Sequence, residues 1–173
     1  MLLITHLIIF ISTLVAMIRV DGIFKKKMKT TEEKAKGPVV KYVNKVRVRY
    51  NDTDRMGIVY HGNYPMYFEI SRLEMLRERG LVYREMEEMG VMLPVSEIQI
   101  KYIKSAYYDD VLNVEVTLKE KPSVRVKFGY RITNQNDELI CTGSVTLACV
   151  DSVTRRPCRA PEYFMKCFPE YDE

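Results

Sequence analysis

The stretch KVRVRYNDTDRMGIVYHGNYPMYFEISRLEMLRERG, residues 45–80, changes its apolar period part-way along. Over residues 45–50 apolar side chains alternate with Lys and Arg, which is the two-residue period of a half-buried strand. Over residues 64–79 they recur three or four apart, which predicts an amphipathic helix. The strand's inner residues would be Val46, Val48 and Tyr50, and those of the helix Tyr67, Ile70, Leu73 and Leu76, with Arg72, Arg77, Glu78 and Arg79 outside that face.

Three residues mark the expected ends of this helix. Asn63 is of the type that caps helix N-termini, and Pro65 is tolerated in a first turn. Gly80 suits the position just after a helix, where the backbone often turns left-handed. The sequence YREMEEMG that follows, residues 83–90, predicts a short second helix.

The rest of the chain has the pattern of strands. Alternating or apolar runs cover residues 93–104, 112–118, 124–132 and 138–151, and NQND before the last run predicts a turn. One strand, one long helix and then a meander of strands indicate an α+β fold, in which a five-stranded antiparallel sheet wraps around a single helix. Such a sheet has two edges to protect, so we expect pairing with a second copy.

Length and charge limit the class of protein. The 173 residues, 47% of them hydrophobic, suffice for one globular domain with a sizeable core and short extensions. The net charge of +4 comes largely from residues 1–27, without which the chain is close to neutral. Binding to a nucleic-acid backbone requires clustered positive charge, so we expect no nucleic-acid partner.

The four cysteines show neither CxxC spacing nor a nearby histidine, so we expect no metal site. Cys141 and Cys149 fall on one expected strand, roughly 26 Å apart, which is too far to bridge within that strand. Reduced, mostly buried thiols in the cytoplasm are therefore expected.

The head of the chain allows three interpretations. Residues 1–18 carry no formal charge, and lysines follow them at 25–27. The head is an anchor on the inner face of the membrane, a secretory signal, or the product of a start assigned too early, with the native chain beginning at Met28. We divide the chain into this head, residues 1–27, a polar leader, 28–40, and a domain, 41–169.

The motif in residues 50–64, Y-x-D-T-D-x-x-G-x-V-Y-H-x-N-Y, resembles that of the hot-dog fold thioesterases. The similarity is to the 4-hydroxybenzoyl-CoA thioesterase family, and within it to the acyl-CoA branch linked in bacteria to the Tol-Pal system. Residues 102–116 and 150–164 resemble later elements of the family, so the likeness covers about residues 45–165. Asn51 departs from the acid often found at its position, a surface-type difference.

This resemblance implies a hot-dog fold and a homodimer or homotetramer with active sites at the subunit interface. It also implies no metal or redox cofactor, with coenzyme A entering only as part of the substrate. The expected reaction is hydrolysis of an acyl-CoA or acyl-carrier-protein thioester to the free acid and thiol.

The chemistry of the loop also follows from helix physics. The start of a helix presents unpaired N–H groups and a partial positive charge, which would stabilise the charge that grows on a thioester oxygen during attack. A carboxylate a few residues earlier either takes a proton from water as a general base or attacks the carbonyl itself. The sequence leaves both roles open.

The resemblance distributes the roles over the loop residues. It implies Asp54 as the catalytic carboxylate, the His61 N–H as the donor to the thioester oxygen and Tyr50 as a supporting group. Asp52 is expected to tie the loop by accepting backbone N–H bonds. The expected substrate-binding residues are Gly57, Val59, Tyr60 and Asn63, together with Lys121, Ser123 and Arg125 near the phosphates of coenzyme A.

Several alternatives compete with this interpretation. DTDRMG begins like a calcium loop, but Met56 and Asn63 stand where that loop needs ligands. Glu69 lies on the helix, where another hot-dog subgroup keeps its catalytic acid. A hot-dog module that only binds acyl-CoA and a hydroxyacyl-thioester dehydratase are the other functions considered.

Overall fold

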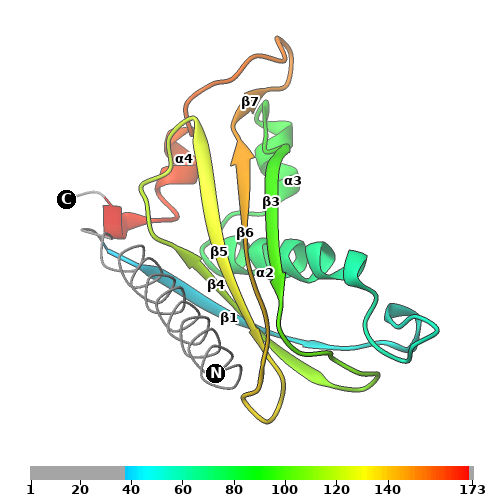
Figure 1. The fold of residues 1–173 in the computed structure, drawn as a ribbon. Helices are drawn as coiled ribbons and strands as arrows, with labels where there is room; N and C mark the ends of the chain where they lie inside the picture. Colours follow the sequence, from blue (N-terminus) through cyan, green and yellow to red (C-terminus); the bar gives the residue numbers. More distant parts are fainter. Residues whose placement is uncertain (1–37, 172–173) are drawn as a thin grey trace, which may run out of the picture. The chain divides into compact units, whose positions relative to one another are not determined.

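A computed structural model describes residues 38–171, which form a five-stranded antiparallel sheet with one long helix against it (Figure 1). The strand order is β1-β4-β5-β6-β3. The strands are β1 (Val40–Arg47), β3 (Val95–Tyr102), β4 (Val111–Leu118), β5 (Arg125–Thr133) and β6 (Leu139–Ala148). The predicted α+β hot-dog architecture is therefore confirmed.

The long helix, α2 (Tyr64–Glu78), lies across one face of this sheet (Figure 1). The ring of Phe68 in α2 stacks on the ring of Tyr130 in β5, with the ring centroids 4.1 Å apart. The predicted position of the helix is correct, but its buried face is displaced: Ile70 is 37% exposed, whereas Arg72 is only 7% exposed. The buried residues of α2 are Tyr64, Tyr67, Phe68, Ser71, Arg72, Met75 and Leu76.

The displaced face of α2 has a simple physical reason. Its residues still recur at the three- and four-residue spacing of a helix, but the face includes Ser71 and Arg72, which hydropathy alone assigns to solvent. The Arg72 Nη1 lies 3.4 Å from the Tyr130 hydroxyl, and the residue is only 7% exposed. The Tyr130 hydroxyl thus gives Arg72 a polar partner on the buried face of the helix.

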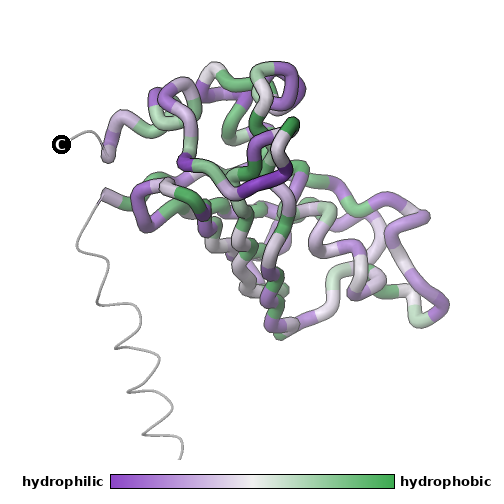
Figure 2. The backbone as a smooth tube through the Cα atoms, turned by 90° about the horizontal axis from the view of Figure 1, so that it is seen from above, coloured by the Kyte–Doolittle hydropathy of each residue, from purple (hydrophilic) through white to green (hydrophobic). Residues whose placement is uncertain are grey.

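Alternation along the strands builds the core between helix and sheet. Figure 2 shows hydrophobic and hydrophilic residues following one another along the strands. The clearest case is β4, where four alternate residues are completely buried. They are Leu112, Val114, Val116 and Leu118. Burying four such side chains contributes roughly 6 kcal/mol or more to folding.

The first strand ends earlier than its pattern predicts. β1 stops at Arg47, and although Val48 is buried, Tyr50 stands in a 3₁₀ turn, η1 (Tyr50–Asp52), and is 79% exposed. The expected inward position of Tyr50 is therefore wrong. Its ring packs instead against Tyr108 in an edge-to-face contact.

The smaller elements cover the ends of the sheet. The second helix was predicted correctly and is α3 (Tyr83–Glu88). A two-stranded sheet of β2 (Val91–Met92) and β7 (Val150–Asp151) was not predicted. The long last strand expected over 138–151 is broken at Cys149, because β7 leaves β6 to pair with β2. The tail carries α4 (Glu162–Met165) and a 3₁₀ turn, η3 (Pro169–Tyr171).

The side chains of the edge strand β3 are largely exposed to solvent. On β3 seven of eight residues are exposed, including Ile98 at 42% and Tyr102 at 48%.

Three of the four cysteines are buried, as expected. No helix within residues 38–171 has the length and apolar character to span a bilayer. The predicted head, residues 1–27, lies outside the described part of the chain.

Candidate active site

The loop between β1 and α2 is a small hydrogen-bonded structure. Thr53 and Val59 form an antiparallel bridge, and the Asp54 N–H donates to the Ile58 carbonyl at 2.9 Å. The turn at the tip of the loop requires Gly57, whose φ of +74° is one that side chains with a Cβ rarely adopt. Gly57 therefore lets the backbone turn at this point.

Asp52 ties this loop to the rest of the domain, as expected. Its side chain is almost completely buried and accepts hydrogen bonds from the Arg49 N–H at 2.9 Å and the Tyr67 hydroxyl at 3.0 Å. The Arg49 guanidinium adds an ion pair at 3.0 Å. Burial alone would raise the pKa of Asp52, but these hydrogen bonds outweigh it and hold the pKa below its ordinary value.

Asp54 is half-buried and is held by one carboxylate oxygen only. Its Oδ1 accepts the Met56 N–H at 2.8 Å, which fixes the orientation of the carboxylate. The other oxygen, Oδ2, has no hydrogen-bond partner within residues 38–171. One oxygen of Asp54 is therefore anchored and the other is available to a water molecule or a carbonyl carbon.

The amides just before α2 are the second component of the site. A 3₁₀ turn, η2 (His61–Asn63), leads directly into the helix. Among residues 38–171, neither the His61 N–H nor the Gly62 N–H donates a hydrogen bond. The Tyr102 hydroxyl donates to the His61 carbonyl at 2.9 Å and fastens the turn to the end of β3. Two free amides at a helix start are suited to a carbonyl oxygen that becomes negative.

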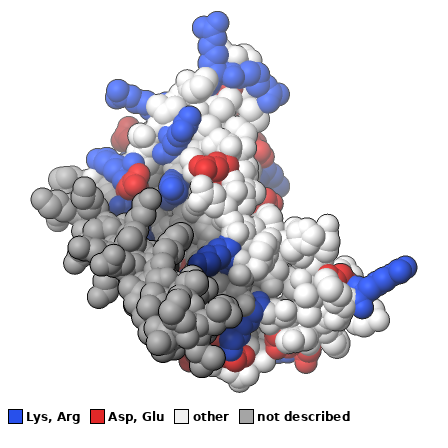
Figure 3. Space-filling view, in the orientation of Figure 1, with Lys and Arg blue, Asp and Glu red and all other residues white. Residues whose placement is uncertain are grey.

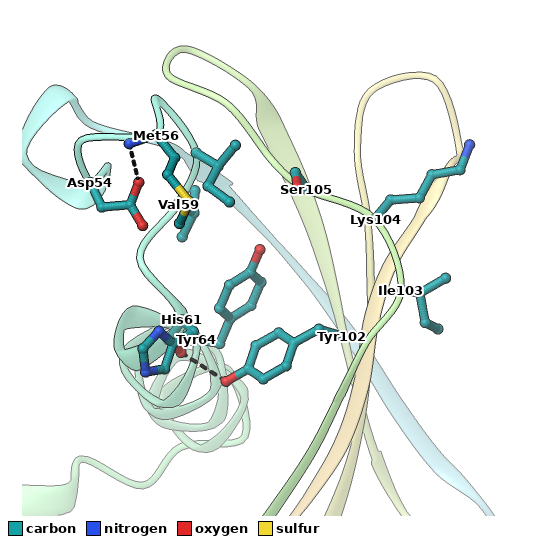
Figure 4. Close-up of a pocket in the computed structure, with 10 residues that line it drawn as sticks. Asp54, Met56, Val59, His61, Tyr64, Tyr102, Ile103, Lys104 and Ser105 are labelled. Atoms are coloured by element: carbon teal, nitrogen blue, oxygen red, sulfur yellow. Dashed lines mark hydrogen bonds between the residues drawn. The ribbon is translucent and has the colours of Figure 1, made fainter.

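A cavity of about 230 Å³ joins these two components. Figure 4 shows Asp54 and His61 on one side of it and Ile103, Lys104 and Ser105 across from them. The cavity is lined by Asp54, Met56, Ile58, Val59, His61, Tyr64, Tyr102, Ile103, Lys104 and Ser105. The carboxylate and the helix start therefore border one space, although Asp54 and His61 are seven residues apart in the sequence.

Two tyrosines form the floor of the cavity, where Tyr64 and Tyr102 meet edge-to-face with centroids 5.2 Å apart. Burial, with smaller effects of Cys141 and Tyr102, raises the pKa of Tyr64 to about 12. Its hydroxyl therefore stays neutral at physiological pH, so the floor adds no negative charge beside Asp54.

Four other predicted site residues do not line the cavity. Tyr60 packs its ring against His61, with centroids 4.4 Å apart, and Gly57 forms the exposed loop tip. Asn63 occupies the cap position of α2 but does not cap it, because its side chain donates to the Asp52 carbonyl at 2.9 Å. Tyr50 is on the outside of the loop. Their proposed roles stay predictions.

The predicted phosphate-binding residues come together elsewhere. Lys121, Ser123 and Arg125 line a second cavity of about 270 Å³, at the start of β5. Lys127 of β5 adds a further cation, while Glu97 and Glu120 border the same space. On the face drawn in Figure 3, Lys and Arg side chains lie among Asp and Glu side chains.

Sequence reasoning missed the part of the first cavity that comes from β3 and the loop after it. Tyr102, Ile103, Lys104 and Ser105 reach the site only because β3 runs past the start of α2. Within residues 38–171, no three His, Cys, Asp or Glu side chains are grouped as a metal site would require.

The fold and this loop define a class, the hot-dog thioesterases, and comparison with known proteins agrees. The model of the thioesterase-like superfamily matches residues 48–168. A putative acyl-CoA thioesterase of Bacillus subtilis, YneP, is 34% identical over 126 residues, covering 73% of this chain and 88% of that protein. The chain belongs to the thioesterase-like superfamily.

Two further relatives place it within that class. The acyl-CoA thioester hydrolase YbgC of Escherichia coli is 30% identical over 125 residues, covering 72% of this chain and 93% of YbgC. The crystal structure of a DHNA-CoA thioesterase from Staphylococcus aureus superposes with a TM-score of 0.71 at 33% identity, covering 76% of this chain and 89% of that one. The protein is thus a thioesterase, as its loop motif indicates.

Proposed function

We propose that the protein hydrolyses acyl-CoA thioesters to a free acid and coenzyme A. The observation that carries this proposal is the shared cavity, which the Asp54 carboxylate and the start of α2 both border. The names of the relatives, an acyl-CoA thioesterase and an acyl-CoA thioester hydrolase, support the same substrate class.

In the proposed reaction the thioester oxygen accepts a hydrogen bond from the His61 N–H, and the Gly62 N–H lies beside that donor. As the carbonyl carbon is attacked, negative charge grows on this oxygen, and the amides stabilise it most in the transition state. One lost donor of this kind typically costs about 3 kcal/mol of barrier. The carbon–sulfur bond then breaks, and the thiolate leaves and takes up a proton.

Asp54 supplies either a base or a nucleophile to this reaction. As a base, Oδ2 takes a proton from water, whose oxygen attacks the carbonyl. As a nucleophile, Oδ2 attacks and forms an anhydride, which water then cleaves. A single turnover in ¹⁸O-labelled water that leaves the label on Asp54 would establish the anhydride, because water that attacks the thioester carbonyl directly cannot label Asp54.

The second cavity is proposed to hold the phosphates of coenzyme A, through Lys121, Ser123 and Arg125. Arg125→Gln is expected to raise KM for an acyl-CoA about fivefold, since an exposed ion pair contributes up to about 1 kcal/mol. The same variant should leave KM unchanged for the acyl N-acetylcysteamine thioester, which lacks the phosphates. Steady-state thiol release measures both.

Arg131→Gln is the matched control for Arg125→Gln, because Arg131 is exposed on β5 and does not line the cavity. An equal KM rise with the truncated thioester would contradict phosphate binding at Arg125. The other substrate class considered is an acyl-carrier-protein thioester. High activity on such a thioester that Arg125→Gln does not change would favour that class.

We propose that a second copy of the chain pairs along β3 and completes the site. The edge of β3 is exposed with its apolar Ile98, and the cavity lies at the end of the same strand. Ile98→Glu is therefore expected to convert a dimer, twice the chain mass of 20.3 kDa, into monomers with lower activity. Light scattering after size exclusion measures the mass.

The control for this change lies on the opposite edge of the sheet. Val43 of β1 is 52% exposed, so Val43→Glu adds the same charge to a comparable site. Dissociation by Val43→Glu and not by Ile98→Glu would move the interface to β1.

We further propose that the domain functions in the cytoplasm, where its four free thiols would stay reduced.

A further inference from the structure

A pair of cysteines faces each other where β6 ends. Val150 and Pro157 form an antiparallel bridge, and the Cys158 N–H donates to the Cys149 carbonyl at 2.9 Å. Residues that flank an antiparallel bridge and share a backbone hydrogen bond are neighbours across the two segments. Cys149 and Cys158 are therefore cross-strand neighbours, although nine positions separate them in the sequence.

The Cα separation expected for such neighbours lies within the range of a disulfide. Directly opposed, hydrogen-bonded residues of an antiparallel pair have Cα atoms about 5.5 Å apart. Disulfides usually span Cα separations of about 4.4 to 6.8 Å. The other two thiols have different surroundings. Cys141 is completely buried near the far end of β6, and the Cys167 Sγ lies 3.5 Å from the Tyr163 carbonyl.

The two sulfurs of the pair differ in their accessibility to solvent. Cys149 is completely buried, whereas Cys158 is partly exposed. Burial first, and then the neighbouring Cys158, raise the pKa of Cys149 to about 11. An oxidant from solvent would therefore meet Cys158 first, and Cys149 would act afterwards as the resolving thiol.

A tyrosine hydroxyl completes the cluster. The Tyr163 hydroxyl is buried, and no group in the described chain accepts or donates a hydrogen bond to it. Burial raises the pKa of Tyr163, as do the thiols of Cys158 and Cys149. A buried hydroxyl without a partner is rare, and here it is available to donate to a sulfur that becomes negative.

We propose that Cys149 and Cys158 are a redox-sensitive modification site, reduced at rest and joined as a disulfide by peroxide. The Cys158 thiolate attacks the peroxide, the O–O bond breaks, and Cys158 becomes a sulfenic acid as hydroxide leaves. The Cys149 sulfur, losing its proton, then attacks the Cys158 sulfur and displaces water. Two electrons pass from the two thiols to one peroxide, and a dithiol reductant reverses the change.

The disulfide would fasten the tail of the domain to the sheet. The Cys149 N–H donates to the Val124 carbonyl at 2.9 Å, and the Ala160 N–H donates to the Ser123 carbonyl at 2.7 Å. A covalent bond between Cys149 and Cys158 adds to these backbone bonds, and it constrains the unfolded chain as well.

Peroxide treatment of the full chain, followed by tryptic peptide mapping without reductant, tests the proposal. Trypsin cuts after Arg155 and Arg159, so the two cysteines fall in different peptides that stay joined only by the disulfide. Fragment ions should place the link at Cys149 and not at Cys141. The melting temperature should rise by roughly 5 °C and return on reduction.

Cys158→Ser is the matched control, since it removes the accessible sulfur and keeps the buried one. We expect this variant to give no linked peptide and no rise in melting temperature. A link that joins other cysteines, or Cys158 converted to sulfinic acid with no link, would overturn the proposal. Because these measurements require no substrate, their outcome is independent of the proposed hydrolysis.

Discussion

Asp54→Asn is expected to lower kcat for acyl-CoA hydrolysis by at least about 100-fold, the scale on which a general base or nucleophile contributes. The amide keeps the size of the side chain and an oxygen that can accept the Met56 N–H, so the loop should keep its shape. It cannot take a proton from water or form an anhydride. Release of coenzyme A, followed with a thiol-reactive dye, measures the loss.

Glu69→Gln is the matched control for this variant. Glu69 is the other carboxylate considered for catalysis, but its side chain is 61% exposed on α2 and does not line the cavity. We expect its kcat to stay within a few-fold of the native value. A large loss in Glu69→Gln together with normal turnover in Asp54→Asn would transfer the catalytic role to the helix. Binding of acyl-CoA without release of thiol by the native chain would instead favour a binding module.

Asp52→Asn is expected to lower the free energy of unfolding by about 2 to 3 kcal/mol, although Asp52 lies only two residues from Asp54. The buried carboxylate accepts bonds from the Arg49 N–H, the Arg49 guanidinium and the Tyr67 hydroxyl. An amide supplies one acceptor oxygen where three donors converge, and its NH₂ opposes one of them. Urea denaturation followed by circular dichroism measures the change.

The stability that Asp52 contributes should also depend on pH. Its pKa is lower in the folded state than in the unfolded chain, where it is about 3.9. The contribution is therefore complete above about pH 5 and disappears as the pH falls through the folded-state pKa. Native protein and Asp52→Asn should thus converge in stability at low pH.

Asp109→Asn is the comparison that isolates burial. Asp109 pairs with Arg47 at 2.8 Å, but both side chains are more than half exposed. Its removal should cost less than about 1 kcal/mol. Equal effects of the two variants would show that the hydrogen bonds of Asp52 contribute no more than a surface ion pair.

Much of this fold could be predicted because its elements have strong periodic patterns. The alternation in β4 and β5 and the spacing in α2 predicted the sheet and the helix against it. The rotation of α2 could not be predicted, because Arg72 is buried beside Tyr130, a residue 58 positions away. The break at Cys149 was hidden for a similar reason, since β7 pairs with β2, which precedes β3 far back in the sequence.

The candidate site divides along the same line. Residues within the loop, such as Asp54 and Gly57, were identified from a contiguous motif, and the roles that depend on substrate stay predictions. Tyr102 carries no local signal, because its contact with the His61 carbonyl joins residues 41 apart. Tyr50 shows the opposite case, in which a local signal was misleading. The alternating pattern of β1 continues to Tyr50 in the sequence, but the strand ends earlier and the Tyr50 ring is exposed.

The most direct measurement is a crystal structure of Asp54→Asn with an intact acyl-CoA bound. The thioester oxygen should lie about 2.7 to 3.1 Å from the His61 nitrogen, with the carbonyl carbon within about 3.5 Å of the side chain at position 54 or of a water that it holds. A thioester bound away from the start of α2, with its oxygen on other donors and position 54 facing only solvent, would contradict the account.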